Sequence, residues 1–157
     1  MLHLCTVEVR GQLFHRELLR VGKYAHVSHD VTEQNFPLDS VERAVRNMAL
    51  LDAAVLGREV KTVAVEALLL EKRLRPATVT ETLTWGYQHP PLLPVPPEGY
   101  LHAVALNARN VVPDKDGYSV LCVATYEGSS HGQTLTTRRY NATTWQTSRY
   151  LFLCVAL

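Results

Sequence analysis

The sequence predicts an α+β fold: a mostly antiparallel sheet of about eight strands with one long amphipathic helix packed on it. The helix is indicated by apolar residues at helical spacing between residues 38 and 56. The sheet is indicated by the rest of the chain, where β-branched and aromatic residues alternate with polar ones. The length of 157 residues and the 46% share of hydrophobic residues fit a single domain over residues 1–157 with one core.

The predicted helix covers residues 38–56. Pro37 precedes it, and Gly57 stands where a helix of this length would end. Asp39 and Glu42 have the spacing of a capping box at its start. Its buried stripe would consist of Val41, Val45, Met48, Leu51 and Val55. Such a helix needs a sheet against which its apolar side can pack.

The strands are expected over nine segments: 2–9, 13–19, 24–29, 61–70, 78–87, 100–107, 118–126, 133–140 and 149–155. Segment 13–19 could instead form a helical turn. Segment 149–155 is apolar on both faces, so it must lie in the middle of a sheet or be covered by another subunit. We expect the buried position within the chain, and the subunit contact stays open as the alternative.

A proline-rich connector is predicted over residues 89–98, between an N-terminal half that contains the helix and a C-terminal β-meander. Five of the eight prolines fall between residues 90 and 97, and such a stretch favours extended polyproline II geometry over sheet pairing. We interpret it as a structural crossover. A ligand for an aromatic groove and a boundary between two sub-lobes are the alternatives.

Charge and cysteine content exclude several classes of protein. Sixteen basic residues against fifteen acidic ones give a formal net charge of +1, so no global field attracts nucleic acid or an anionic membrane. Three cysteines are too few for a disulfide framework. The alternating start of the chain does not look like a secretory signal, and no apolar run is long enough to cross a membrane. We expect a soluble, cytoplasmic protein without membrane contact.

The most plausible catalytic site, if the chain is an enzyme, consists of His26, His29, Asp39 and Glu42. The start of the predicted helix would favour an anionic substrate group there. The two histidines could bind a metal only with a turn between them and a third ligand from far along the chain, so no metal site is assigned. Glycine-rich phosphate-binding loops do not occur in the sequence, and no cofactor is expected.

The chain also resembles the hot-dog thioesterases and dehydratases over about 50 residues. The helix, the segment 59–70 and the strand around Thr80 and Thr84 are similar to the helix-and-strand core of that family. The resemblance implies a sheet wrapped around a central helix, dimerisation, and acyl-thioester chemistry by an acid or His near the helix start. His29, Asp39 and Glu42 are the residues in that neighbourhood.

The cysteines offer little for nucleophilic catalysis. Cys5, His102 and Asp116 follow the chain order of papain-like enzymes, but Cys5 lies in a strand-like segment with no helix start to lower its pKa. Cys122 and Cys154 alternate with core residues and are predicted to be small buried hydrophobic side chains.

The C-terminal segment combines basic and aromatic residues. Three arginines and no acidic residue follow Glu127, and the candidate binding residues are Arg138, Arg139, Tyr140, Arg149 and Tyr150. Such a surface could contact single-stranded nucleic acid. The alternative, which we favour, is a threonine-rich solvated sheet face, because neighbouring strand residues point to opposite faces.

We conclude from the sequence that the chain is a non-enzymatic protein that binds a protein partner or assembles into a homo-oligomer. The candidate catalytic groups form no convincing set, and the apolar segment 149–155 suggests protein contact. Small β-rich domains of this kind are frequent among viral assembly and accessory proteins, which is an analogy at the level of the fold. Hot-dog-like acyl-thioester hydrolysis or dehydration and single-stranded nucleic-acid binding are the alternatives.

Overall fold

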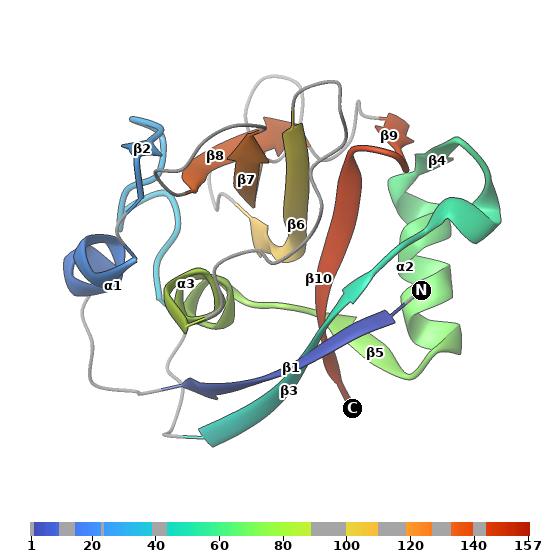
Figure 1. Cartoon of the computed structure of the whole chain (residues 1–157), viewed down its shortest axis with the longest axis horizontal. Helices are drawn as coiled ribbons and strands as arrows, with labels where there is room; N and C mark the ends of the chain where they lie inside the picture. The colour runs from blue at the N-terminus through green and yellow to red at the C-terminus, as the bar shows by residue number, and fades with distance from the viewer. Residues whose placement is uncertain are drawn as a thin grey trace.

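A computed structural model of the chain describes residues 2–9, 15–22, 24–38, 44–88, 100–109, 119–126, 133–139 and 144–157, and it confirms the α+β fold. Its centre is a mixed, mostly antiparallel sheet of eight strands in the order β1-β3-β10-β6-β7-β8-β2, with β5 also paired to β10 (Figure 1). These strands are β1 (Leu2–Val9), β2 (His26–Val27), β3 (Ala44–Leu51), β5 (Leu74–Pro76), β6 (Tyr100–Arg109), β7 (Ser119–Tyr126), β8 (Thr134–Arg139) and β10 (Tyr150–Ala156). A second, two-stranded sheet pairs β4 (Glu59–Lys61) with β9 (Thr144–Gln146).

The helices cover both faces of the large sheet. They are α1 (His15–Val21), α2 (Thr62–Glu71), α3 (Val79–Gln88) and the short 3₁₀ helix η1 (Ala54–Leu56). In Figure 1 the sheet curves around α3, with β6, β7 and β8 on one side of the helix and β1 and β3 on the other. Helix α2 lies outside this curve, next to β10 and β5. None of the described helices is both long and apolar enough to cross a membrane.

Each face of the sheet has its own hydrophobic core. The inner core joins α3 to the sheet and to Leu18 of α1, and Leu151 and Leu153 of β10 point into it. The outer core joins α2 to the other face of the sheet. Phe152 and Cys154 of β10 point into this core, and along the strand they alternate with the residues that point into the inner core. This alternation is the period-two pattern of a strand that is buried on both sides.

Strand β10 confirms the buried position expected for the apolar segment 149–155. It pairs antiparallel with β3 on one side, where Phe152 lies opposite Leu51. On its other side it pairs in parallel with β6 and antiparallel with β5. Residues 151–155 are all buried within the chain. No subunit contact is needed to cover this strand, so its sequence no longer argues for a partner.

The helix predicted over residues 38–56 is wrong. Residues 44–51 form β3, residues 54–56 form η1, and residues 39–43 lie outside the described part of the chain. Strand β3 is central, between β1 and β10, so its residues 48–51 are buried on both faces. Two members of the predicted stripe, Val45 and Val55, are 65% and 80% exposed. A continuous apolar run always contains residues at helical spacing. A central strand needs such a run as well, so the spacing did not distinguish the two structures.

Three predicted strands are helices instead. Segment 61–70 forms α2, segment 78–87 forms α3, and segment 13–19 overlaps α1, which matches its helical alternative. In α3 a threonine at every second position imitates the alternation of a strand. The hydroxyls of Thr82 and Thr84 nevertheless donate to backbone carbonyls four residues back, one helical turn away. The second half of α2 consists of Ala, Leu and Glu, which are strong helix formers.

The remaining predicted strands match described ones. Segment 2–9 is β1, and the segments 100–107, 118–126, 133–140 and 149–155 correspond to β6, β7, β8 and β10. Segment 24–29 contains the two-residue strand β2. The proline-rich connector predicted over 89–98 lies outside the described residues.

Candidate functional site

The predicted catalytic residues that are described lie on the surface. His26 is exposed in β2, and His29 is exposed next to Asp30, with 3.0 Å between His29 Nε2 and Asp30 Oδ1. Asp39 and Glu42 lie outside the described residues. The reason for placing a site there was the start of a long helix, and residues 44–51 form a strand. The site therefore stays a prediction without that support.

Metal ligands do not gather in the part of the chain that the structure describes. No group of three or more His, Cys, Asp or Glu side chains among these residues is placed to hold an ion. The exposed pair His29 and Asp30 supplies only two such groups.

The structure brings together a cluster around His102 of β6. His102 is fully buried, and its Nε2 lies 3.0 Å from Nη2 of Arg138 on β8. A guanidinium group can only donate, so Nε2 is the acceptor and the ring proton lies on Nδ1. The ring of Tyr150 stacks on the imidazole with 5.0 Å between centroids, and Trp145 meets Tyr150 edge-on.

The surroundings of His102 keep its imidazole neutral. Burial and the positive charge of Arg138 lower the pKa of His102 to about 3. A general base near neutral pH needs a pKa close to the working pH and a free lone pair, whereas this Nε2 already accepts from Arg138. The cluster therefore has the chemistry of a structural polar network. Two of the three residues in papain-like order, Asp116 and the side chain of Cys5, lie outside the described part of the structure.

The two cysteines predicted to be buried are buried. Cys122 and Cys154 are both inaccessible to solvent. Burial raises the pKa of the Cys122 thiol to about 12, although the charge of Arg138 opposes the shift. The thiol of Cys154 lies 3.3 Å from the carbonyl oxygen of Ala49 on the neighbouring strand. Both behave as small hydrophobic side chains rather than nucleophiles.

The predicted basic and aromatic residues do not form one surface. Arg138 and Tyr150 meet at His102, where both are half-buried and take part in the fold. Arg139 is exposed, and as the next residue of β8 it points to the opposite face of the sheet. The carbonyl of Arg149 accepts the backbone N–H of His102 at 2.8 Å. Tyr140 lies outside the described residues.

Helix α2 carries a surface that the sequence reading missed. Its inward side packs Val65, Leu68 and Leu69 into the outer core. Its outward side carries Val63, Ala67 and Leu70 at positions i, i+4 and i+7; all three are exposed, Val63 by 67% and Leu70 by 73%. We call these three residues the α2 outer face. In the strand predicted for this segment, Val63 and Leu70 would have pointed to opposite sides, so the pattern was hidden.

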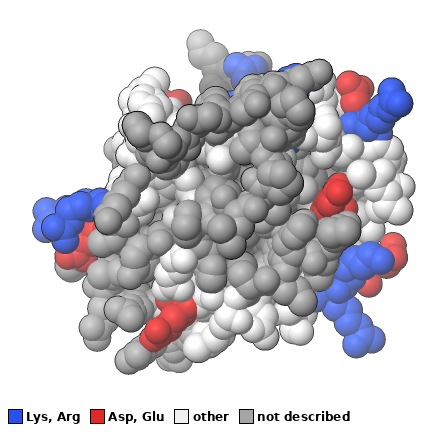
Figure 2. Space-filling model, in the orientation of Figure 1, with Lys and Arg blue, Asp and Glu red and all other residues white. Residues whose placement is uncertain are grey.

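Charged residues lie at both ends of the α2 outer face. Glu59 and Lys61 are exposed just before α2. Glu71, Lys72 and Arg73 are exposed at its C-terminal end, where Lys72 Nζ lies 3.6 Å from Glu71 Oε1. In Figure 2, on the side where Figure 1 places α2, uncharged atoms and an acidic group lie between charged groups at the upper and the lower right. The apolar face is thus bordered by both signs of charge along the helix axis.

Comparison with known proteins adds no further constraint. No protein-family model, no curated protein and no solved structure matches the chain.

Proposed function

We propose that the chain is a non-enzymatic protein-binding module and that it binds its partner through the α2 outer face. The observation that carries the proposal is the exposure of Val63, Ala67 and Leu70 along one line of a helix whose opposite side is already buried. A helix that is apolar all round is normally enclosed on every side. Burying one Val or Leu side chain contributes about 1.5–3 kcal/mol, so a partner gains most from covering this line.

Further exposed apolar residues precede α2 in the sequence. Val55 and Leu56 of η1 are 80% and 42% exposed, and β4 leads from η1 directly into α2. Scattered single apolar residues on a surface need no explanation, but several in one short segment favour a protein contact. This supports the segment from η1 to the end of α2 as the binding region.

A catalytic role has weaker support. The best-placed buried histidine, His102, has its Nε2 engaged by Arg138 and a pKa of about 3, so it does not exchange protons near neutral pH. The hot-dog alternative needs an open acid near the start of a wrapped helix. The wrapped helix is α3, and the acid in its first turn, Glu81, is bound by Arg75 through both carboxylate oxygens. Nucleic-acid binding is also disfavoured, because Arg138 points inward and bonds to His102.

The proposal is tested by photo-crosslinking of the full chain in the cells that express it. A photoreactive benzoylphenylalanine replaces Ala67 at the centre of the α2 outer face, and Glu33, an exposed residue outside α2, is the matched control position. We expect a discrete crosslinked protein from position 67 that is absent from position 33. It should also disappear when Val63→Lys and Leu70→Lys are added.

Two results would contradict the proposal. One is a set of crosslinked products from position 67 that does not differ from the control. The other is a product that persists when both flanking apolar residues are lysine, because an apolar contact does not tolerate two buried cations.

A further inference from the structure

We infer that strand β10 is exchangeable between two copies of the chain, with the turn at residues 147–149 as the hinge. In the exchanged dimer each copy places its β10 in the sheet of the other copy. The exchange does not involve the α2 outer face. It follows from the place of β10 in the sheet and from the contacts of the turn that precedes it.

The space that β10 occupies lies between strands that do not pair with one another (Figure 1). Strand β3 pairs with β10 on one side, and β6 and β5 pair with it on the other. Its buried side chains enter both cores; those in the inner core are Leu151, Leu153 and Val155, and those in the outer core are Phe152 and Cys154. The β10 of a second copy satisfies the same pairing and fills the same two cores, so it is the occupant that fits this space.

The turn before β10 provides a defined hinge. Thr147 is held before β4, because its backbone N–H donates to the carbonyl of Arg58 at 2.9 Å and its hydroxyl to the carbonyl of Gly57 at 2.9 Å. The carbonyl of Arg149 accepts a backbone N–H of β6 at 2.8 Å and so belongs to the main sheet. Ser148 lies between these two anchored residues and is exposed. A change in the direction of the chain at Ser148 therefore leaves the contacts on either side in place.

Exchange alters few contacts. In the monomer and in the exchanged dimer β10 makes the same strand pairs and fills the same cores, so these contributions to the free energy cancel. The backbone N–H of Arg149 donates to the carbonyl of Gln146 across the turn at 2.9 Å, and this bond is lost when the turn opens. The two forms therefore differ mainly in the turn and in the cost of bringing two chains together.

Protein concentration and turn length decide between the two forms. A short connection keeps the chain's own β10 at an effective concentration of about millimolar or more, so the monomer dominates at micromolar concentration. A turn that is too short to close within one chain favours exchange instead. Because β10 is buried on both faces, it leaves its place only when the fold opens, and each form persists once it has folded.

Refolding of the full chain from urea at two concentrations tests the inference, with size-exclusion chromatography as the readout. Wild type should give a dimer fraction at least about tenfold larger after refolding near millimolar than near micromolar concentration. Deletion of Ser148 should raise the dimer fraction near micromolar concentration at least about tenfold. Ser148→Ala keeps the length of the turn and is the matched control, which should behave as wild type.

A disulfide identifies the strand that is exchanged. Cys154 of β10 lies opposite Ala49 of β3 in the strand register, so Ala49→Cys places two thiols across one strand pair. Refolding with a glutathione redox couple joins them within one chain in the monomer and between chains in the exchanged dimer. On a denaturing gel without reductant, the isolated dimer should therefore run as two linked chains and the monomer as one. Wild-type dimer refolded in the same way should separate into single chains.

Three results would overturn the inference. One is a chain that forms no dimer near millimolar concentration and none when Ser148 is deleted. Another is a dimer of the Ala49→Cys variant that separates on the gel although its thiols are oxidised, because each sheet then holds its own β10. The third is a dimer that Leu70→Lys abolishes, because the α2 outer face would then hold it. That result would leave the proposed function intact.

Discussion

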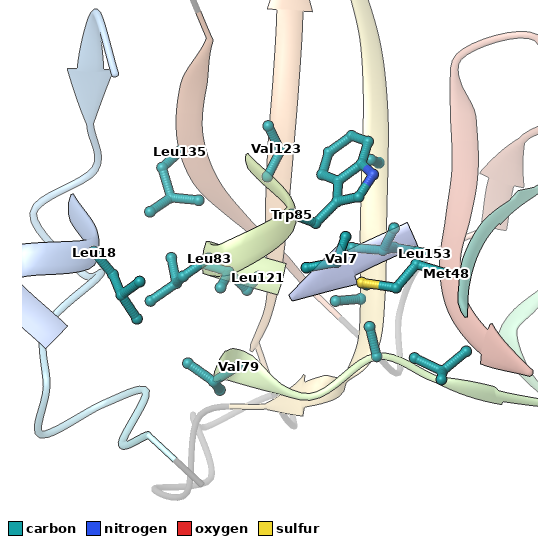
Figure 3. Close-up of a cluster of buried hydrophobic side chains, with 14 of the residues drawn as sticks. Val7, Leu18, Met48, Val79, Leu83, Trp85, Leu121, Val123, Leu135 and Leu153 are labelled. Atoms are coloured by element: carbon teal, nitrogen blue, oxygen red, sulfur yellow. The ribbon is translucent and has the colours of Figure 1, made fainter. Parts of the chain in front are cut away.

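Helices α2 and α3 have the same length, ten residues, but composition and burial are reversed between them. Helix α3 contains three threonines, a glutamate and a glutamine, yet residues 79–86 are all buried (Figure 3 shows Leu83 and Trp85 among the core side chains). Helix α2 is mostly apolar, with a threonine and two glutamates, and has one side exposed. The difference teaches that position relative to the curved sheet, rather than polarity, decides which helix is enclosed.

Helix α3 can be enclosed because its polar atoms have partners inside the fold. The hydroxyls of Thr82 and Thr84 donate to carbonyls of the preceding turn at 2.6 and 2.7 Å. Glu81 accepts from both Arg75 nitrogens at 2.8 and 2.6 Å, and from the backbone N–H of Thr78 at 2.9 Å. The side-chain amide of Gln88 bonds both backbone groups of Glu8 on β1. Buried polar groups with such partners are tolerated.

The carboxylate of Glu81 is the most sensitive point of this network. Burial alone would raise the pKa of Glu81, but the hydrogen bonds from Arg75 and Thr78 and the charges of Arg75 and Arg46 lower it below its ordinary value. The charged form is therefore favoured by folding. Its stabilising effect is present above the pKa of the unfolded chain and is lost as the pH falls through the folded pKa.

The largest expected effect comes from removing this carboxylate from α3. Glu81→Ala should lower the free energy of unfolding by about 3 kcal/mol, because it breaks two charge-assisted hydrogen bonds to Arg75 and the cap at Thr78. Glu71→Ala on α2 is the control and should change it by less than about 0.5 kcal/mol, because Glu71 is exposed. Urea denaturation measures both. Equal effects would mean that the two helices do not differ in this way.

A second pair of variants compares the two sides of α2. Leu69→Ala should cost about 2–4 kcal/mol, because Leu69 is only 2% exposed and its removal leaves a cavity. Leu70→Ala should cost less than about 0.5 kcal/mol in the monomer, since Leu70 is 73% exposed. Thermal denaturation at low protein concentration checks both. A large loss for Leu70→Ala there would show that the chain itself covers this side.

A third prediction concerns the close packing of α3. A Cβ at Gly86 would collide with the hydroxyl oxygen of Tyr24, so Gly86→Ala should lower the free energy of unfolding by about 1–3 kcal/mol. Tyr24→Phe removes the colliding oxygen and should recover part of the loss in the double variant. Urea denaturation of the double-mutant cycle tests this. Additive losses would show that the two residues do not touch.

Measured over a single pH unit, the smallest expected effect is a pH dependence of stability from His102, on the outer-core side of the sheet. His102 has a folded pKa of about 3 against 6.5 when unperturbed, so between these values the unfolded chain binds a proton that the folded chain does not. The free energy of unfolding should therefore fall by about 1.4 kcal/mol per pH unit below pH 6.5 and show no His102 dependence above it. His102→Gln should flatten this slope. An unchanged slope would assign it to other groups.

The longer strands of the second half, β6, β7, β8 and β10, and strand β1 were predictable from sequence, whereas the helices and the three-residue strand β9 were not. Along strands β6, β7 and β10, successive residues point alternately into the inner and the outer core. Sequence rules for strands detect such apolar runs of β-branched residues. Strand β3 is apolar on both faces at residues 48–51, so its spacing fitted a helix as well as a strand. In α3, threonine stands at every second position, as it would in a strand. The hydrogen bonds from their hydroxyls to backbone carbonyls one turn back cannot be recognised from the sequence.

The candidate binding residues stay a prediction, and one surface of the molecule was not predicted. Arg138 and Tyr150 were grouped from their basic and aromatic character, and they do meet, but around His102 inside the fold. The α2 outer face was invisible because its segment was read as a strand. Periodicity assigns a residue to a face only after the type of element is known.

The place of β10 has a consequence for how the protein is made. Every other described strand precedes β10 in the chain, yet β10 alone links the β1–β3 pair to β6, β7 and β8. While the ribosome is still synthesising the chain, these two groups of strands have no partner between them. The sheet closes only after residues 150–156 have left the exit tunnel, so the main sheet cannot be completed strand by strand as the preceding segments emerge.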